Sequence, residues 1–487
     1  MELSRRSLLA TMLAAPVGLR AAEDEGWIPL FDGKTLNGWK AQNPDSWKVV
    51  DGALAADGPR SHLYYTGSVR DSKFRNFELK ATYKTKYGAN SGIYIHTKWQ
   101  DQGWPAAGFE VQVNNSHGGE NQYRERKKGG SLYSVRNVYK SFAPDEQWNE
   151  MYIAVRGKWI QIRLNGVTTV NYVQPDNPPQ VDKGFQRLIT EGTFALQCHD
   201  PESKAWYRDI RVRPLPDNMR ADMPFAAPVV DQNYIDWLTL GNANMPLVDY
   251  HTHEKGITKQ EMVANAQRLG FMYGIALNVG KFHPANNDGA VREWLATMKG
   301  LPVFTALQGE GREWVQVISK KAMAEADYCF TDSMTWTDDS GRRMRLWIKE
   351  ETQVGDRQKF MDTFVDRTVK LLRDEPIDIY ANPTFLPDEI APIYAELWTQ
   401  SRMSQVIEAA VKNDVAIELN NRYKIPSLDF VKLAKQAGAK FSFGTNNSDG
   451  NLGRMEYALQ MVKGANLTWR DIFIPHAGGN RAKRWKL

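Results

Sequence analysis

Two histidines lie one residue apart in the segment VDYHTH, residues 248–253. Successive side chains of a β-strand point to opposite faces, so His251 and His253 share one face if this apolar segment is a strand. Imidazole is both a common metal ligand and a side chain that exchanges protons near neutral pH. The pair is therefore a candidate metal-binding or acid–base site.

Polar side chains also follow the other apolar segments of the C-terminal half. Seven short apolar segments alternate there with segments whose apolar residues recur at three- and four-residue spacing. This pattern predicts an α/β (βα)7 barrel, in which working groups gather at the C-terminal ends of the strands. The residues at those ends are His251, His253, Asn278, Glu310, Asp332, Asn382, Glu418, Asn420, Asn446 and Ser448. The predicted strands cover residues 246–253, 272–280, 302–311, 327–334, 377–385, 415–421 and 440–448, and the predicted helices include 259–270, 290–300, 360–375 and 427–438.

This half of the chain resembles the PHP (polymerase and histidinol phosphatase) family of metal-dependent phosphoesterases. The resemblance lies in VDYHTH on the first strand and in FGTNNSDGNLG, residues 443–453, on the last. It implies a divalent metal ion of unknown identity, held by His251, His253 and Glu310, with Asp332 as a further ligand. In that family two or three such ions activate water and clamp a phosphate.

The chain departs from the family pattern at several ligand positions. Asn278 and Asn382 stand where the pattern has a histidine, and Asn446 and Ser448 stand where it has Asp-x-His. A neutral amide oxygen is a weak ligand for a transition metal beside imidazole or carboxylate. We therefore expect an incomplete metal site in a PHP-like barrel without phosphatase chemistry. One residual metal, a metal-free pocket for a polar ligand, ordinary buried histidines and an intact phosphoesterase remain as alternatives, the last disfavoured by the lost ligands.

The N-terminal half shows the alternation of short β-strands. Segments such as NFELKATYKT (76–85), SGIYIHTKW (91–99) and GTFALQCHD (192–200) alternate apolar and polar residues and are separated by Gly, Asn, Asp and Pro. The Asn-Gly pair at 165–166 predicts a tight hairpin turn. Because no long amphipathic segment interrupts residues 26–215, we expect an all-β jelly-roll (concanavalin-like) sandwich.

Three of these strands place two polar side chains on the same face. Period-two alternation predicts a polar sheet face large enough for a carbohydrate, and a merely solvated outer face is the alternative. The pairs are Glu110 with Gln112, His96 with Lys98, and Gln197 with His199.

Residues 27–215 are similar to the 3-keto-disaccharide hydrolase family of secreted jelly-roll domains. The matching segments are WIPLFDGKTLNGWK (27–40), SGIYIHTKW (91–99), GFEVQVNN (108–115), GSLYSV (130–135), WNEMYIAVRGKWIQIRLNG (148–166) and GTFALQCHDPESKAWYRDIRVRPL (192–215). The resemblance implies cleavage of 3-keto-glycosides. A ketone acidifies the hydrogen on the neighbouring carbon, so a base can remove it, the glycosidic oxygen can leave, and water can add to the resulting alkene. Such a site needs a base, an acid and an electrophile for the enolate oxygen.

Candidate residues for these roles follow from the polar faces. Glu110 and His199 are the expected base and acid, in either order, and Lys98 or a bound divalent cation would stabilise the enolate. His96 and Gln112 are expected to orient the sugar or to bind the metal. The other expected substrate-binding residues are Gln197 and, as aromatic platforms for sugar rings, Tyr133 and Trp104, for which a place in the core is the alternative.

The chain is too long for one hydrophobic core, which predicts several domains. We expect an export signal at residues 1–22, a jelly roll at 23–215, a linker at 216–245 with a short helix near 234–240, a barrel at 246–475 and a tail at 476–487. Arg5 and Arg6 precede a mostly apolar run and resemble a twin-arginine signal, which predicts a periplasmic or extracellular location. No later apolar stretch approaches the ~18 residues of a membrane span.

The charge pattern excludes other classes of partner. The formal net charge is +5, with acidic and basic residues interspersed, so we expect no nucleic-acid-binding surface. The two cysteines, Cys198 and Cys329, lie in different predicted domains and are expected to be buried free thiols. An exported carbohydrate hydrolase or lyase acting on 3-keto-glycosides fits these observations best. The alternative is a jelly roll that only binds glycans, attached to a metal-dependent PHP-like hydrolase or to a barrel that binds a ligand or partner without catalysis.

Overall fold

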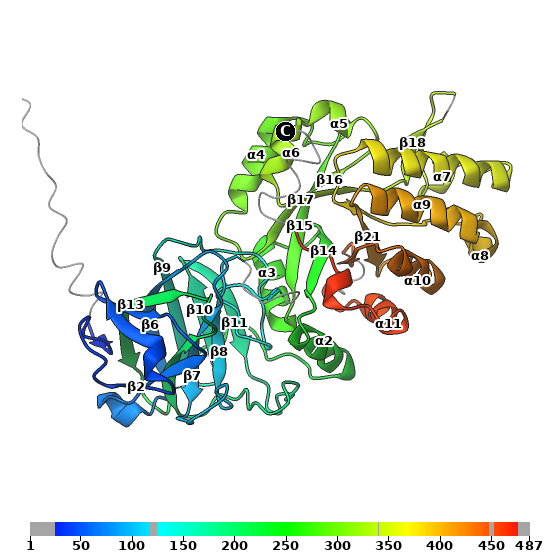
Figure 1. Cartoon of the computed structure of the whole chain (residues 1–487). Coiled ribbons are helices and arrows are strands. Elements are labelled where there is room, and N and C mark those ends of the chain that lie inside the picture. Colours follow the sequence, from blue (N-terminus) through cyan, green and yellow to red (C-terminus); the bar gives the residue numbers. More distant parts are fainter. Residues whose placement is uncertain (1–24, 117–123, 220, 339, 448–451, 476–487) are drawn as a thin grey trace, which may run out of the picture.

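The computed structural model describes residues 25–116, 124–219, 221–338, 340–447 and 452–475. The predicted export signal, the tail at 476–487 and Ser448 lie outside the described residues. Figure 1 shows an all-β domain followed along the chain by a domain of alternating strands and helices.

Two antiparallel sheets form the N-terminal domain, as the alternation predicts. The larger sheet has the strand order β11-β10-β9-β6-β13-β4-β3, with β1 paired to β13, and the smaller one has the order β2-β5-β12-β7-β8. The strands are β1 (Ile28–Pro29), β2 (Trp39–Ala41), β3 (Trp47–Val50), β4 (Ala53–Ala56), β5 (Ser61–Tyr65), β6 (Phe77–Thr85), β7 (Ser91–Thr97), β8 (Phe109–Val113), β9 (Asn149–Arg156), β10 (Trp159–Leu164), β11 (Val167–Val173), β12 (Thr193–Cys198) and β13 (Ala205–Pro214).

Apolar side chains of both sheets meet in one core. In β6 the apolar residues Phe77, Leu79, Ala81 and Tyr83 all belong to this core. The predicted turn between β10 and β11 is confirmed, because Asn165 (φ 49°) and Gly166 (φ 82°) both adopt left-handed backbone conformations. The sequences ALAA of β4 and SHLYY of β5 lack the polar–apolar alternation by which strands such as β6 and β8 can be predicted.

The segment between the two domains contains the predicted helix. It forms α2 (Gln232–Asn242), whose first turn is capped by the Asp231 side chain accepting a hydrogen bond from the Tyr234 amide. Asparagine and proline residues follow this helix and lead directly into the first strand of the second domain.

Seven parallel strands close into a barrel in the C-terminal domain, and all seven are strands that the sequence predicts. They are β14 (Val248–Thr252), β15 (Met272–Val279), β16 (Phe304–Gly309), β17 (Tyr328–Thr331), β20 (Ile379–Tyr380), β21 (Ala416–Asn420) and β22 (Phe441–Gly444), and a separate hairpin is made of β18 (Thr335–Thr337) and β19 (Arg343–Arg345). The helices are α3 (Lys259–Leu269), α4 (Asp288–Thr297), α5 (Trp314–Val317), α6 (Lys320–Glu325), α7 (Arg357–Asp374), α8 (Tyr394–Leu397), α9 (Gln400–Lys412), α10 (Leu428–Gln436) and α11 (Glu456–Gly464).

The barrel helices begin at the capping residues that the sequence supplies. Thr258 and Glu261 form a reciprocal capping box at the start of α3, and the Ser427 hydroxyl caps α10. Both cysteines are buried free thiols, as predicted. Among the described residues, no helix combines the length and apolarity needed to span a bilayer.

Candidate functional site

The Glu110 carboxyl lies on the face of the five-stranded sheet that points away from the sandwich core. Strand β8 turns Phe109, Val111 and Val113 into the core, so Glu110 and Gln112 take the opposite face. Glu110 is 7% exposed and accepts hydrogen bonds from the Tyr94 hydroxyl (2.8 Å) and from the Gln197 amide nitrogen (3.1 Å). Burial raises the pKa of Glu110, while the Tyr94 hydrogen bond and the Arg187 charge oppose this rise.

Strand pairing explains why these three side chains meet. Tyr94 on β7 is directly opposite Glu110 on β8, and Ala195 on β12 is opposite Tyr94. Gln197 is two residues beyond Ala195, so its side chain lies on the same face. Gly92 provides the space for the carboxyl group, because a Cβ atom there would lie 2.6 Å from Glu110 Oε1.

His199 and Asp200 form a polar pair at the end of β12. His199 Nδ1 lies 2.6 Å from Asp200 Oδ2, and Asp200 is fixed by the Ser203 amide and hydroxyl. The Trp104 ring packs 5.2 Å from the His199 ring. Trp104 also packs against His62 (5.5 Å), whose ring lies 5.2 Å from Tyr94, so these rings connect His199 with the Glu110 face.

The expectation that His96 and Lys98 share this polar face is wrong. His96 has a positive φ of 54°, and the pairing of β7 with β12 shifts register between Tyr94 and Thr97. This bulge turns the His96 ring onto Phe77, 5.5 Å away, where His96 Nε2 is 2.9 Å from the Arg75 carbonyl oxygen. His96 therefore does not contribute to the Glu110 face, and Lys98 is an exposed residue after the strand end.

A buried ion pair lies at the edge of the sheet next to Glu110. The Lys127 ammonium is 3.3 Å from Glu125 Oε1, and the two side chains are 0% and 2% exposed. The half-buried Tyr133 donates its hydroxyl to Glu125 Oε2 (3.1 Å), and Lys127 lies over its ring. The Tyr133 amide bonds the Glu110 carbonyl (2.9 Å), which places Tyr133 directly beside Glu110. Lys127 is thus a buried cation at this edge of the sheet, whereas Lys98 is exposed.

The remaining predicted residues are distributed around this face. The Gln112 side chain donates to Asn90 Oδ1 (2.7 Å), and its amide oxygen Oε1 is buried without a partner in the described structure. His62 on β5 packs against Trp104 and Tyr94, and burial lowers its pKa to about 3.

Sequence reasoning missed Tyr94, Asp200, Glu125, Lys127 and Arg187. The alternation of SGIYIHT could have identified Tyr94, because it lies two residues after Gly92 and so on the same face of the strand.

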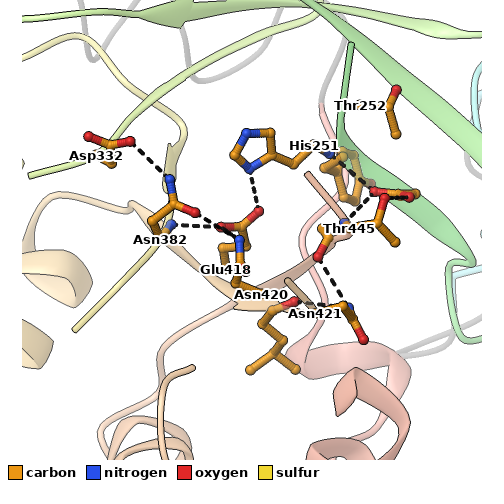
Figure 2. Close-up of polar contacts among 12 residues, drawn as sticks. His251, Thr252, Asp332, Asn382, Glu418, Asn420, Asn421 and Thr445 are labelled. Atoms are coloured by element: carbon orange, nitrogen blue, oxygen red, sulfur yellow. Dashed lines mark hydrogen bonds and ion pairs between the residues drawn. The ribbon is translucent and has the colours of Figure 1, made fainter. Parts of the chain in front are cut away.

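A second polar network fills the C-terminal ends of the barrel strands (Figure 2). His251 Nδ1 lies 2.6 Å from Glu418 Oε1, and the other Glu418 oxygen accepts from the Asn382 amide (2.7 Å) and the Asn420 side chain (2.9 Å). The Asn382 side chain continues the network to Asp332 (2.9 Å). Asn382 and Asn420 therefore donate hydrogen bonds directly to carboxylates.

The predicted metal ligands do not gather as one coordination set. The Asn278 side chain donates a hydrogen bond to Glu310 Oε1 (2.9 Å), and His253 Nδ1 lies 3.1 Å from the Ala276 carbonyl oxygen. His251 Nε2 has no hydrogen-bond partner among the described residues, while a carboxylate holds the other ring nitrogen. Within the described ranges, no group of three or more His, Cys, Asp or Glu side chains could hold a metal ion. The divalent metal stays a prediction from the motif.

The comparisons with known proteins concern the N-terminal domain. Residues 26–213 match the model of the 3-keto-alpha-glucoside-1,2-lyase-like domain. The curated 3-keto-disaccharide hydrolase of Bacteroides thetaiotaomicron is 27% identical over 232 aligned residues, covering 39% of this chain and 79% of the relative. Residues 26–213 therefore carry a 3-keto-disaccharide hydrolase-like domain.

Two solved structures from Parabacteroides distasonis, provisionally assigned as glycosyl hydrolases, are also similar to this chain. The first is 21% identical, covers 40% of this chain and 97% of its own, and has a TM-score of 0.35. The second is 26% identical, covers 39% and 99%, and has a TM-score of 0.31. The family match ends at residue 213, before the barrel begins, so the PHP resemblance remains a prediction.

The space at Gly92 gives a first prediction. Gly92→Ala is expected to lower the free energy of unfolding by about 1–3 kcal/mol, because the new methyl group overlaps the Glu110 side chain. In a Glu110→Ala background the same substitution is expected to cost much less, since the clashing atoms are gone. Urea unfolding of the four proteins measures both costs. Equal costs in the two backgrounds would show that Glu110 does not occupy this space.

The barrel network gives a second prediction. His251→Ala leaves a buried Glu418 carboxylate without its ion partner and is expected to destabilise the barrel by about 3–5 kcal/mol. His283→Ala, at a half-buried position, is the matched control and is expected to change stability by about 0.5 kcal/mol or less. The unfolding transition of the barrel measures both, and a small loss for His251→Ala would contradict the pairing.

Proposed function

We propose that the N-terminal domain cleaves 3-keto-glycosides by elimination and hydration, with Glu110 and His199 as its proton-transfer residues. The observation that carries this proposal is the buried Glu110 carboxyl, held by Tyr94 and Gln197 on the same face that the His199–Asp200 pair borders. The family match supports the substrate class.

Glu110 removes the proton from C2, next to the C3 ketone. Burial raises its pKa, which makes the carboxylate a stronger base at neutral pH. Each carboxylate oxygen has more than one lone pair, so the hydrogen bonds from Tyr94 and Gln197 orient the group without blocking it. The electron pair from the C2–H bond forms the enolate of C2 and C3.

His199 protonates the departing glycosidic oxygen. Asp200 binds His199 Nδ1, which leaves Nε2 to carry the transferred proton and stabilises the charged ring. As the C1–O bond breaks, its electron pair leaves with the oxygen, and the enolate electrons form the C1=C2 double bond. Water then enters the site, and the proton held by Glu110 exchanges with it. The water oxygen adds to C1 and its released proton returns to His199, while Glu110 delivers the exchanged proton to C2, so the net reaction is hydrolysis.

Lys127 supplies the positive charge for the enolate oxygen in place of Lys98. Its buried ammonium group lies over the ring of Tyr133, whose backbone amide bonds the Glu110 carbonyl. A cation in a water-poor site stabilises developing negative charge more than one in bulk water. Trp104 and Tyr133 flank the face and provide apolar ring surface for the sugar.

Two substitutions separate the acid from the base. Glu110→Gln is expected to lower kcat on a 3-keto-disaccharide by roughly 10²–10⁴-fold with every leaving group, because proton removal at C2 is lost. His199→Gln is expected to cost as much on a disaccharide but far less on a 3-keto-glucoside with a nitrophenol leaving group, which needs no proton. Steady-state kinetics measures this split. Full activity in both variants would refute these two roles, and no turnover by the unmodified protein would favour a domain that only binds glycans.

The pH dependence gives a further prediction. A base must be deprotonated, so kcat/KM rises as pH increases through the Glu110 pKa, and this limb is expected above the usual range of a glutamate. The Tyr94 hydrogen bond lowers that pKa, so Tyr94→Phe is expected to move the limb to higher pH. Tyr64→Phe is the control, because the Tyr64 hydroxyl has no hydrogen-bond partner in the described structure. A limb unmoved by Tyr94→Phe would contradict Glu110 as the base.

A further inference from the structure

Residues 124–140, here called the bridging segment, connect the Glu110 face with the barrel. The first part runs along the outer edge of β8, where the Gly130 amide bonds the Gln112 carbonyl (2.9 Å) and the Tyr133 amide bonds the Glu110 carbonyl (2.9 Å). The bridging segment thus continues the five-stranded sheet beyond β8 on the side of the candidate site.

The apolar side chains of the bridging segment are divided between two cores. Leu132 and Val135 belong to the core of the N-terminal domain, whereas Val138 and Tyr139 belong to the core of the barrel. Tyr139 also donates its hydroxyl to the Met245 carbonyl (3.1 Å), just before the first barrel strand. The segment therefore cannot keep both packing arrangements unless the two domains are docked.

Arg136 of the bridging segment contacts the C-terminal end of α3. This helix lies beside β11, where the two domains meet (Figure 1). Arg136 is 4% exposed and donates from Nε to the Gln267 carbonyl (2.7 Å) and from Nη2 to the Arg268 carbonyl (2.9 Å). The last carbonyl groups of a helix lack partners within the helix, and a cation there is favourable.

Two other contacts anchor the ends of the segment. The Asn244 side chain accepts from the Arg126 amide (3.0 Å) and donates to the Arg124 carbonyl (2.9 Å), so it holds the backbone on both sides of Glu125. Lys140 pairs with Asp327 (2.7 Å) at the other end. Between these anchors lie the three residues that border Glu110, namely Glu125, Lys127 and Tyr133.

We propose that the barrel positions one wall of the N-terminal site, with Asn244 and Arg136 as positioning residues that hold Glu125, Lys127 and Tyr133 against Glu110. This inference rests on the proposed function for its effect on turnover. Its structural part, the anchoring of the bridging segment by the barrel, stands apart from that function. The barrel is then a component of the 3-keto-glycoside site, whatever its own mouth binds.

Displacement of the wall formed by Glu125, Lys127 and Tyr133 is expected to change the pKa of Glu110. The titratable or charged groups around Glu110 are Tyr94 on β7, His199 after β12, Arg187, and the paired Glu125 and Lys127 on the bridging segment. Burial is the largest influence that raises the Glu110 pKa, and the Glu125 and Lys127 charges move away as a pair, so a displaced wall that admits water lowers the pKa. The acid limb of kcat/KM should therefore move to lower pH, opposite to the effect of Tyr94→Phe.

The test uses the full chain with Arg136→Ala, and with Arg136→Lys as a rescue because lysine keeps a cation at the end of α3. Hydrogen–deuterium exchange of residues 128–138 is expected to become about tenfold faster in Arg136→Ala. In the same variant kcat/KM falls about tenfold, the acid limb moves to lower pH, and Arg136→Lys restores part of each effect. Arg163→Ala, an exposed arginine on β10, is the matched control and leaves all three readouts unchanged.

A milder pair of variants covers the case in which Arg136→Ala does not fold. Lys140→Ala breaks a partly exposed anchor and is expected to raise exchange at residues 136–140 about twofold, whereas Lys48→Ala breaks a comparable ion pair away from the barrel and has no effect there. Unchanged exchange in the anchor variants overturns the inference. Faster exchange with unchanged kcat/KM and pH limb also overturns it. If the unmodified protein turns over no 3-keto-glycoside, the proposed function fails, and exchange alone decides the anchoring.

Discussion

A carboxyl group that loses contact with water must be compensated by hydrogen bonds or nearby charge, and Glu110 is compensated by the Tyr94 hydroxyl and the Gln197 amide. These contacts require that β7, β8 and β12 stay in one register, since a shift of one residue would turn Glu110 into the core. The sandwich core fixes that register through the apolar residues on the opposite faces of the same strands. The site is therefore a consequence of how the two sheets pack.

The two domains contribute different kinds of polar network. Around Glu110 the groups are few and border a face that aromatic side chains flank, which suits a neutral, hydroxyl-rich ligand. In the barrel mouth, amides from Asn278, Asn382 and Asn420 bond the carboxylates. These asparagines thus satisfy the buried carboxylates by hydrogen bonds from neutral groups.

The sequence predicts most of the fold and part of the site, and local patterns explain which parts. The Asn165–Gly166 turn and the seven barrel strands are signalled by turn chemistry and by apolar periodicity, which neighbouring residues determine. The bulge at His96 depends on one residue with positive φ, and period-two alternation cannot anticipate it. Lys127 and Arg136 escape prediction for another reason. Their environments are created by a segment that packs against two domains at once.

The most direct measurement is the hydrogen content of the product formed in D₂O. Cleavage of a 3-keto-disaccharide by removal of the C2 proton and later hydration must place solvent deuterium at C2 of the released 3-keto-sugar, and mass spectrometry with NMR locates it. The proposed chemistry predicts one deuterium at C2 in each product molecule, well above the level in an enzyme-free control. A product that retains its original hydrogen at C2, formed from a substrate whose deuteration at C2 does not slow turnover, would mean direct displacement at C1 and would contradict a base at Glu110.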